Sequence, residues 1–385
     1  MHSRALARPV VISRAALRML GDAMPRQRRV APAAPGRILV AHHLLLGDTI
    51  MLTPLLAKCR ERWPHADIVM TCPTALLGLY AGRPYGVRAL GYDPRVPGTL
   101  RALFAESGYD LAFVPGDNRY SWLAQALGAR WTVAFAGDSP AYKNWPIDEL
   151  RSYPDARAAW GDLVAALVDG PAPHPYRNGD WPAPFARPFE IPGAPYAVLH
   201  LGAGSPLRHW PADRWRAVAL RLEARGIAVA LSVGPNEATL LDHVGGPSTW
   251  SRYPGTLDLA QLWHLLAGAR MLICPDTGVA HLARVVGTPT VALFGPGSAA
   301  LYGGGAFWSR SPFTALTIRD FPCRDQRTVM KRNIPWIRDC KRFIGNGPGR
   351  CDEARCMHAL TTELVWAEIE RRMASIPDGT TPMRP

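Results

Sequence analysis

An aspartate stands where the first β-rich run of the sequence gives way to a helical pattern. Gly47 and Asp48 directly follow a predicted strand at 37–43 and precede a predicted helix at 49–62. A glycine at this point lets a ligand approach the backbone, and a carboxylate beside it could accept the proton of an attacking hydroxyl group. The alternative is a helix cap, because aspartate at such a position accepts hydrogen bonds from free backbone N–H groups. The position alone leaves both interpretations open.

A glycine-containing loop follows a second predicted strand. It runs His200-Leu-Gly-Ala-Gly-Ser205 and is followed by Arg208. Gly202 and Gly204 would let phosphate oxygens approach the main chain, and Ser205 would donate a hydrogen bond to them. Arg208 could add a bidentate, charge-assisted contact with a diphosphate. Glycine turns after strands also occur without any ligand, so phosphate binding here is a hypothesis.

The sequence from Cys274 to His281 predicts a buried strand that breaks sharply into a helix. It reads Cys274-Pro-Asp276-Thr277-Gly278-Val-Ala-His281. The free N–H groups of a helix N-terminus attract a diphosphate, and the Thr277 hydroxyl adds another donor. His281 lies one turn into the helix on the same face as Thr277, where it either reaches the substrate or packs in the core.

Glu237 follows the turn Gly234-Pro-Asn236 at the end of another predicted strand. An acidic residue in this place is suited to accept hydrogen bonds from ribose hydroxyls, as in other nucleotide-binding folds. Its alternative role is that of a favourable negative charge in the first turn of a helix.

The last quarter of the chain combines cysteines with basic and aromatic residues. Cys323, Cys340, Cys351 and Cys356 are separated by 16, 10 and 4 residues, without a C-x-x-C pair. Structural zinc sites usually have closer ligand pairs, so we interpret them as reduced, packed thiols and expect no metal. A basic aromatic surface around them would suit an acidic glycan, lipid phosphates or single-stranded nucleic acid. Its residues are Arg324, Arg327, Lys331, Arg332, Arg338, Lys341 and Arg342, with Phe321, Trp336 and Phe343.

Two blocks of alternating strands and helices surround these residues, which predicts an α/β protein with two doubly wound domains. Between 171 and 195 eight prolines interrupt the periodicity and indicate a linker. The cleft between the carboxyl ends of the two sheets should hold the active site. In the first block the expected strands are 37–43, 66–73, 109–115 and 131–136, with helices at 49–62 and 121–127. In the second they are 196–201, 227–233, 271–274 and 290–294, with helices at 211–225, 257–269 and 279–286.

These blocks divide the chain into four predicted parts. Residues 1–36 form a basic extension, 37–180 a first α/β domain, 181–361 a second α/β domain, and 362–385 a terminal helix and tail that pack back on the body. The extension up to Arg37 carries eight arginines and a single acid, Asp22, with apolar residues between them. It is either an amphipathic helix on a membrane surface or a leader without a structural role.

Composition narrows the class of protein. The chain has 385 residues, 48% of them apolar, and no apolar run near the roughly 20 residues of a membrane span. Seven cysteines without a secretion signal favour a cytoplasmic protein with reduced thiols. A net charge of +13 predicts acidic partners such as anionic lipids or phosphorylated and carboxylated sugars. Without a basic recognition helix or an RNA-binding signature, no nucleic-acid partner is expected.

Taken in order, these stretches resemble glycosyltransferase family 9, the ADP-heptose:lipopolysaccharide heptosyltransferases, over about 37–373. The similarity is carried by several motifs together, none of which is specific alone. They are Arg37-Ile-Leu-Val through Leu46-Gly-Asp48-Thr-Ile with Pro54, His200-Leu-Gly-Ala-Gly through Trp210-Pro211, Pro275-Asp-Thr-Gly-Val-Ala-His281-Leu-Ala through Gly287-Thr-Pro-Thr-Val-Ala-Leu-Phe294-Gly-Pro, and Arg355-Cys-Met357.

The resemblance implies a GT-B fold and inverting sugar transfer without a metal or cofactor, with attachment to the inner face of the inner membrane. It implies that Asp48 is the base and that the acceptor, an acidic lipid-linked glycan, binds near Gly47 and His43. The donor, expected to be ADP-heptose, would contact the opposite domain. The residues implied for the donor are Ser205, Arg208, Glu237, Asp276, Thr277, Gly278 and His281.

The chain departs from the family pattern in ways that affect substrate identity. Arg208 stands where lysine is usual, and Gly297-Ser298 where threonine-aspartate is common. The arginine-rich segment 323–356 is also longer than in a minimal member. A related transferase using another nucleotide sugar, such as an N-acetylhexosamine donor for a surface polysaccharide, therefore remains an alternative. A non-catalytic nucleotide- or nucleic-acid-binding protein is the other, and the sequence does not indicate the oligomeric state.

Overall fold

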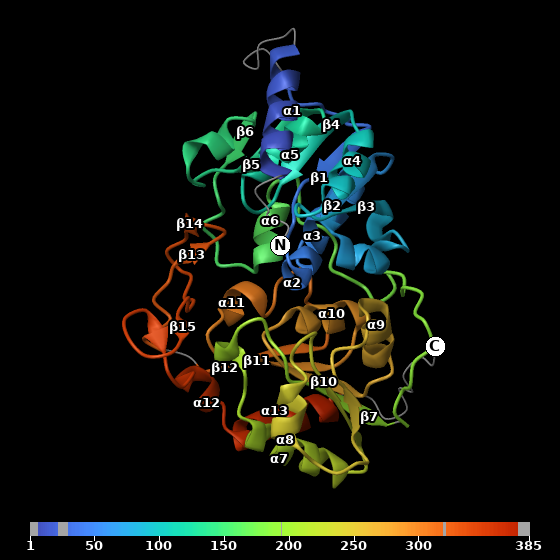
Figure 1. Ribbon diagram of the computed structural model, residues 1–385, viewed down its shortest axis with the longest axis vertical. Helices are drawn as coiled ribbons and strands as arrows, with labels where there is room; N and C mark the ends of the chain where they lie inside the picture. Colours follow the sequence, from blue (N-terminus) through green and yellow to red (C-terminus); the bar gives the residue numbers. More distant parts are fainter. Residues whose placement is uncertain (1–6, 22–29, 194, 319–320, 376–385) are drawn as a thin grey trace.

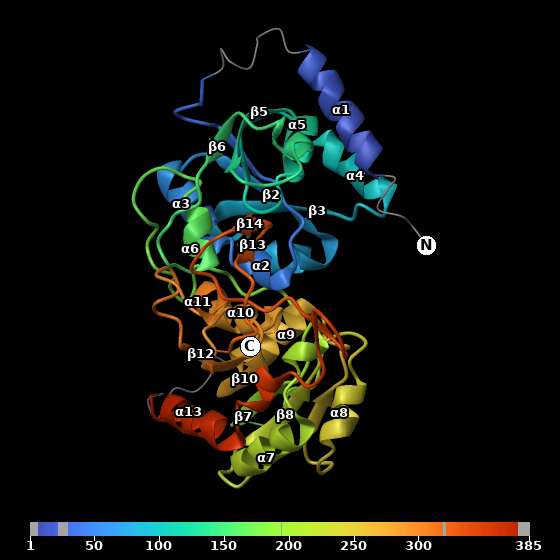
Figure 2. The same cartoon turned by 90° about the vertical axis from the view of Figure 1, so that its left-hand side faces the viewer.

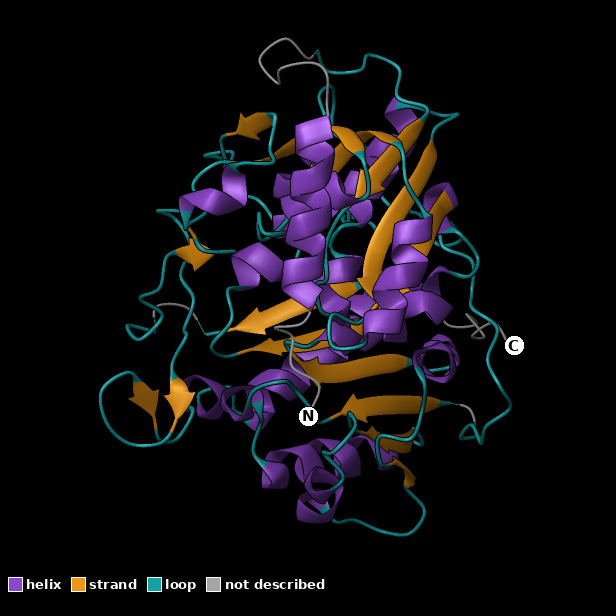
Figure 3. Cartoon of the chain, turned by 45° about the horizontal axis from the view of Figure 1, so that its top comes forward, coloured by secondary structure: helices purple, strands orange, loops and turns teal. Residues whose placement is uncertain are grey.

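The computed structural model describes residues 7–21, 30–193, 195–318 and 321–375. It consists of two α/β halves stacked along the long axis, with α2 (Leu46–Ile50) and α10 (Gly278–Val286) where they meet (Figure 1). Each half contains a parallel six-stranded sheet, which confirms the predicted fold class. Helices lie on both sides of the lower sheet (Figure 3). In the part of the chain described, no helix is both long and apolar enough to cross a membrane.

The first sheet has the strand order β3-β2-β1-β4-β5-β6. The four predicted strands are confirmed. Their apolar residues are buried on both faces of the sheet, which explains why the sequence pattern revealed them. The two outer strands, β3 and β6, were not predicted; β6 is only three residues long and contains Glu149 and Arg151. The strands are β1 (Arg37–Val40), β2 (Asp67–Pro73), β3 (Val87–Tyr92), β4 (Tyr109–Val114), β5 (Ala129–Phe135) and β6 (Glu149–Arg151).

The second sheet repeats this plan with the order β12-β11-β10-β7-β8-β9. Its four central strands match the predicted ones, and again both outer strands were missed. Edge strands have only one neighbour, so they need less apolar sequence and give a weaker pattern. The strands are β7 (Tyr196–His200), β8 (Ala228–Ser232), β9 (Ser251–Tyr253), β10 (Met271–Pro275), β11 (Thr290–Phe294) and β12 (Phe313–Thr317).

The helices connect successive strands and cover the sheets. In the first half they are α3 (Thr53–Arg62), α4 (Pro97–Ala105), α5 (Tyr120–Ala126), α6 (Trp160–Ala165) and the 3₁₀ segments η2 (Thr74–Tyr80), η3 (Pro84–Gly86) and η4 (Ala141–Asn144). In the second half they are η5 (Pro206–Arg208), α7 (Ala212–Glu223), α8 (Thr239–Val244), α9 (Leu259–Ala267), α11 (Ala299–Tyr302), α12 (Arg355–His358) and α13 (Thr362–Ala374). The described part of the predicted terminal helix, α13, packs on α7 and β11.

The prediction of one helix at 49–62 was wrong. The chain forms α2 first, turns at Met51 and Leu52, and then begins α3. Pro54 lies in the first turn of α3, where its missing N–H is tolerated, but it could not continue α2. The break lets α2 point toward the second half while α3 packs on α6.

The proline-rich linker is packed between the halves. Trp181 is buried. Its ring centre lies 4.8 Å from that of Tyr80 in the first half and 6.2 Å from that of Trp263 in the second. The Tyr176 hydroxyl donates to the Val285 carbonyl at the end of α10. These contacts hold the linker against both halves, so it is more constrained than an extended spacer.

The basic extension forms α1 (Ala7–Gly21), which lies along α5 at the outer end of the first half (Figure 2). Ala15 is fully buried there, and the Arg14 guanidinium donates to the carbonyls of Ala126 and Phe104. Residues 1–6 and 22–29, like the predicted tail from 376, lie outside the described part of the chain. The segment therefore contains a docked helix.

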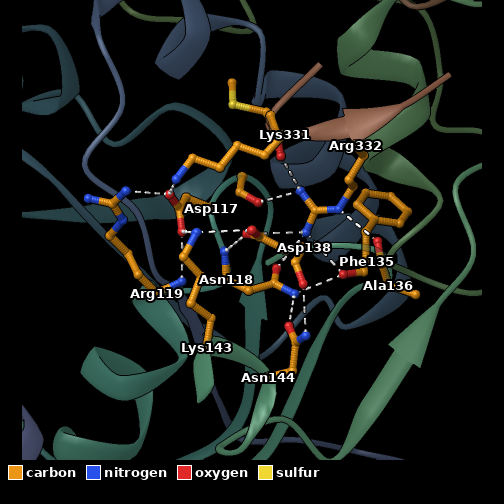
Figure 4. A network of polar contacts seen from close by, with 12 residues as sticks. Asp117, Asn118, Arg119, Phe135, Ala136, Asp138, Lys143, Asn144, Lys331 and Arg332 are labelled. Atoms are coloured by element: carbon orange, nitrogen blue, oxygen red, sulfur yellow. Dashed lines mark hydrogen bonds and ion pairs between the residues drawn. The ribbon is translucent and has the colours of Figure 1, made fainter. Parts of the chain in front are cut away.

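A segment between β12 and α12 crosses back to the first half. Its strand β14 (Arg332–Asn333) pairs with β13 (Thr328–Val329), and the Arg332 guanidinium inserts beyond the ends of β4 and β5 (Figure 4). The guanidinium donates to the carbonyls of Gly116, Phe135 and Ala136, and lies 3.9 Å from Asp138. Two further strands, β15 (Phe343–Ile344) and β16 (Arg350–Cys351), pair with each other before α12 begins.

The prediction of a basic surface in this segment was wrong for two of its arginines, which are buried. Arg332 and Arg324 are buried, because each guanidinium satisfies several backbone carbonyls at once. Lys331 pairs with Asp117, and Arg342 with Asp325, so these charges are also used within the fold. Arg327 and Arg338 remain exposed.

Replacement of Arg332 should destabilise the protein strongly. Arg332→Ala leaves the buried carbonyls of Gly116, Phe135 and Ala136 without their guanidinium donor, while Asp138 keeps its ion pair with Lys143. The loss of these donors should lower the free energy of unfolding by about 3 kcal/mol. The matched control is Arg327→Ala in the same segment, where an exposed side chain is removed and a change within about 0.5 kcal/mol is expected. Denaturant unfolding measures both; equal midpoints for the two variants would show that Arg332 does not hold this segment.

Candidate active site

The candidate site lies where the strand order of each sheet reverses. The reversal falls between β1 and β4 in the first sheet and between β7 and β10 in the second. Open parallel sheets bind ligands beyond the carboxyl ends of the strands at such points. Asp48 follows β1, the loop 201–208 follows β7, and Asp276 follows β10. The topology therefore brings together the three stretches that the sequence singled out.

Helices α2 and α10 cross in direct contact through two glycines. A Cβ atom added to Gly47 would lie 3.3 Å from the Gly278 Cα and 2.9 Å from the His281 ring. A Cβ atom on Gly278 would meet the Leu46 side chain at 3.0 Å. The crossing places the first turn of α2, which contains Asp48, against the N-terminus of α10. Thr277 and Gly278 remain partly exposed beside it.

Asp48 is not the helix cap. The cap residue of α2 is Leu45, three positions before Asp48, and Asp48 lies within the first turn. Its side chain is half-buried, and burial raises the pKa of Asp48 to about 6, with the Asp276 charge adding to the rise and Arg208 opposing it. A carboxylate with such a pKa is ionised at neutral pH yet basic enough to take a proton.

Arg208 and Asp276 form the charged pair nearest to Asp48. Arg208 Nη1 donates to the Asp276 backbone carbonyl at 2.9 Å and lies 3.5 Å from Oδ2 of its carboxylate. Burial raises the pKa of Asp276, while Arg208 and Arg284 oppose the rise. The pairing holds the Arg208 guanidinium beside the start of α10, where about a third of its side chain is exposed to the cleft.

His281 packs in the crossing. Its ring is buried against Gly47, and burial together with Arg284 and Arg208 holds its pKa well below the ordinary value. The ring is therefore neutral at physiological pH. Since the packing interpretation already accounts for this position, the donor contact of His281 stays a prediction.

Glu237 joins two loops of the donor side. Its carboxylate accepts hydrogen bonds from the backbone N–H groups of Ala203 and Gly234, at 3.1 and 2.8 Å. A Cβ atom on Gly202 would lie only 1.9 Å from this carboxylate, which explains the glycine. The side chain is half-buried, and its oxygens have lone pairs left for a hydroxyl group. The predicted ribose contact is compatible with this geometry.

The other predicted residues follow the carboxyl ends of β1, β7 and β10. Thr277 is the cap residue of α10 and Ser205 that of η5; neither side chain accepts a capping hydrogen bond. A Cβ atom on Gly204 would meet nothing within 4 Å, so this loop is open. His43 is half-buried, with its Nε2 3.1 Å from the Tyr92 carbonyl and its ring edge-on to the Tyr92 ring.

The four C-terminal cysteines are free thiols in the structure. Burial raises the pKa of Cys356 to about 11, and its sulfur would lie 3.2 Å from a Cβ atom on Gly295. Among the described residues, no group of three or more His, Cys, Asp or Glu side chains is arranged to hold a metal ion.

With this geometry established, similarity to known proteins decides the family. The model of "Glycosyltransferase family 9 (heptosyltransferase)" matches residues 100–332. Lipopolysaccharide heptosyltransferase 1 of Pseudomonas aeruginosa is 32% identical over 314 residues, which cover 74% of this chain and 85% of that protein. The chain belongs to glycosyltransferase family 9. The predicted resemblance is thereby confirmed.

Solved structures of family 9 share the fold. The family member from Veillonella parvula superposes with a TM-score of 0.66 at 18% identity, covering 89% of this chain and 98% of that one. The Escherichia coli protein described as ADP-heptose LPS heptosyltransferase II gives 0.63 at 16% identity, covering 88% and 98%. These similarities confirm the GT-B architecture of two facing α/β domains.

Three charged or polar residues of this glycosyltransferase site were not predicted. Arg284, one turn after His281, is almost fully buried, with its guanidinium 4.0 Å from the Phe313 ring centre; burial lowers its pKa to about 9. The Tyr302 hydroxyl has its pKa raised by burial and by nearby Asp48 and Asp339. A basic residue within the largely apolar sequence of α10 was the available signal for Arg284. Asp339 reaches the site only through the returning C-terminal segment, which no local pattern reveals.

A larger residue at the glycine crossing should separate the two halves of the site. Gly47→Val places two methyl groups against His281 and Gly278, and overpacking of this kind costs about 1–3 kcal/mol. Because α2 carries Asp48, the displacement should lower kcat for sugar transfer at least about tenfold, since small misplacements of catalytic groups have large effects.

The control is Gly98→Val on α4, where an added Cβ meets nothing within 4 Å. Steady-state kinetics and thermal unfolding should show normal turnover for this variant. Normal turnover of Gly47→Val would mean that the crossing does not position Asp48.

Proposed function

We propose that the protein transfers heptose from ADP-heptose to an acidic lipopolysaccharide core acceptor. Family membership supports the reaction class, and the names of its relatives support this donor and acceptor. The observation that carries the proposal is the glycine crossing, since it sets the half-buried Asp48 carboxylate against the N-terminus of α10.

In the proposed reaction, Asp48 acts as the base. Its carboxylate takes the proton of the acceptor hydroxyl as that oxygen forms a bond to the anomeric carbon of heptose. The bond from this carbon to the diphosphate oxygen breaks, and its electron pair leaves with ADP. Attack from the face opposite the leaving group inverts the anomeric centre. Asp48 and the residues proposed to bind the donor lie on opposite halves, which supports this geometry.

Positive charge from the protein would stabilise the departing ADP. The N-terminus of α10 presents free N–H groups and about half a positive charge, and Arg208 adds a full charge beside it. Thr277 would donate from its hydroxyl, with Gly278 and Ser205 lining the approach. Glu237 would accept from the ribose. We propose that these groups perform the task without a metal ion or cofactor.

A neutral isostere of Asp48 should abolish transfer while leaving donor binding intact. Asp48→Asn removes the proton acceptor but keeps the shape, so kcat should fall at least about a hundredfold. Calorimetry with ADP should show unchanged affinity, because the donor contacts lie on the second half. In the wild type, kcat/KM should decline as the pH falls through about 6, where Asp48 becomes protonated.

Stability supplies the control for this variant. The folded protein holds the pKa of Asp48 above its ordinary value of 3.8, so the ionised carboxylate destabilises the fold increasingly as pH rises from 3.8 through about 6. The Asn variant should therefore be at least as stable as the wild type at neutral pH. An active Asp48→Asn enzyme, or one whose ADP affinity is also lost, would contradict the proposed role.

We also propose peripheral attachment to an anionic membrane surface through α1. Val10, Leu17 and Leu20 share the face of α1 that points away from α5, and their side chains are 50%, 70% and 84% exposed. An apolar stripe on a basic extension suits the interface of a bilayer with acidic lipids. Attachment there would place the acceptor-binding half next to a lipid-linked acceptor (Figure 2).

Removal of this stripe should release the protein from vesicles. Leu17→Ser/Leu20→Ser should reduce co-sedimentation with phosphatidylglycerol–phosphatidylethanolamine vesicles several-fold, and added salt should weaken binding of the wild type. Phe185→Ser, which removes a 90% exposed aromatic from the linker, is the control and should bind normally. Salt-insensitive attachment that only detergent reverses, or equal binding of all three proteins, would argue against this surface.

A further inference from the structure

A cavity of about 800 Å³ lies beside α11, outside the site described above. Its volume falls in the range of about 300–1,000 Å³ that is usual for ligand pockets. Small residues of α11, the following glycines and β12 form one part of its lining, and Arg157, Arg324 and Arg338 form another. The complete lining is Arg157, Ser298, Ala299, Ala300, Gly303, Gly304, Ala315, Thr317, Arg324 and Arg338.

The three arginines carry positive charge without acidic partners. Arg324 uses its guanidinium to donate to the carbonyls of Gly295, Ile318 and Phe294, which are neutral. Arg338 donates only to the carbonyls of Pro335 and Ile337. Within the described residues, none of the three arginines forms an ion pair with a carboxylate. The cavity is therefore positively charged.

A second cavity of about 410 Å³ adjoins the first and shares two of its arginines. Arg324 and Arg338 line both cavities, and the second also contains Arg327. Its acidic residue, Asp325, is paired with Arg342 at 2.9 Å. Because they share these arginines, the two cavities together form an arginine-lined region beside the segment that returns to the first half.

The location relates this region to the acceptor more than to the donor. The donor contacts proposed above lie at β7, β8 and β10, whereas the cavity lies at β11 and β12, on the opposite edge of the sheet. Arg157 comes from the first half, so both halves contribute to the lining. Ser298 lies between the cavity and the candidate site. It lines the cavity, and a Cβ atom added to the preceding residue, Gly297, would lie 2.2 Å from Oδ2 of Asp276.

We propose that this region binds a negatively charged group of the acceptor glycan, a phosphate or a sugar carboxylate, while the acceptor hydroxyl lies at Asp48. Arginine suits both groups, because its planar guanidinium donates to two oxygens at once. The inference rests on the proposed function, since it assigns a specificity site for the same acceptor. It gives the arginine-rich segment a role beyond joining the two halves.

The test removes the two arginines that the fold does not need. Arg157 and Arg338 are exposed, whereas Arg324 is buried and serves the structure. In Arg157→Ala/Arg338→Ala, the KM for a purified acidic core acceptor should rise about tenfold, with kcat and the KM for ADP-heptose unchanged within about twofold. The matched control is Arg101→Ala/Arg310→Ala, which removes two exposed arginines outside both cavities and so changes the net charge equally.

Two acceptor derivatives identify the group that is bound. One has its phosphates removed by phosphatase, and the other has its carboxylates reduced to alcohols. The derivative that lacks the bound group should show the same KM with the wild type and the double variant. If both derivatives still distinguish the two proteins, or if the double variant and the control have equal KM values for the intact acceptor, the proposal is wrong.

A titration without turnover separates this proposal from the proposed function. Binding of the intact acceptor is measured by calorimetry, and the double variant should bind about tenfold more weakly than the control. If the wild type transfers no heptose, the function is wrong, yet the titration still decides whether the arginines bind the glycan. If the wild type transfers heptose and the titration shows equal affinities, the function stands and the arginine site does not.

Discussion

The close crossing of α2 and α10 is the contact on which the site depends. Gly47 and Gly278 allow the two helices to meet at backbone distance, and no larger pair of side chains could occupy this space without moving one half. Because Asp48 lies one residue after Gly47, and the start of α10 one residue after Thr277, the same contact sets the proposed base against the proposed donor site. A hydrophobic core that is continuous across both halves, and includes Trp181, supports it from behind.

The candidate site keeps charged side chains in positions where burial destabilises their charged forms. Asp48 and Asp276 are carboxylates that burial makes less acidic, and Arg284 is an arginine that burial makes a weaker base. A core built for stability alone would use apolar residues here. The attraction between the carboxylates and Arg284 holds both kinds of charge in place, so the diphosphate of the proposed donor would meet positive charge that is already oriented. The neutral His281 ring fills the crossing without adding a competing charge.

The sequence predicts those parts of the fold that local pattern determines. Central strands such as β1 and β10 are buried on both faces, so their continuous apolar sequence predicted them correctly. The positions of Asp48 and Thr277 directly after these strands made them candidate site residues. Edge strands such as β6 have little apolar sequence, so they were missed. Burial of Arg332 could not be predicted, because its partners lie about 200 residues earlier in the chain, at Gly116 and Phe135. Long-range contacts of this kind arise only when the halves come together.

The returning C-terminal segment joins the two halves and contains arginines that are proposed to bind the acceptor. Buried Arg332 fastens the segment to the first half through carbonyl groups that no other cation satisfies as fully. A second attachment lies further along the segment, where the Cys340 N–H donates to the Pro296 carbonyl after β11. Just before it, Asp339 lies near Arg208 and Arg338 lines the cavity. The segment is therefore attached to both halves, and all but one of the arginines that line the two cavities lie along it.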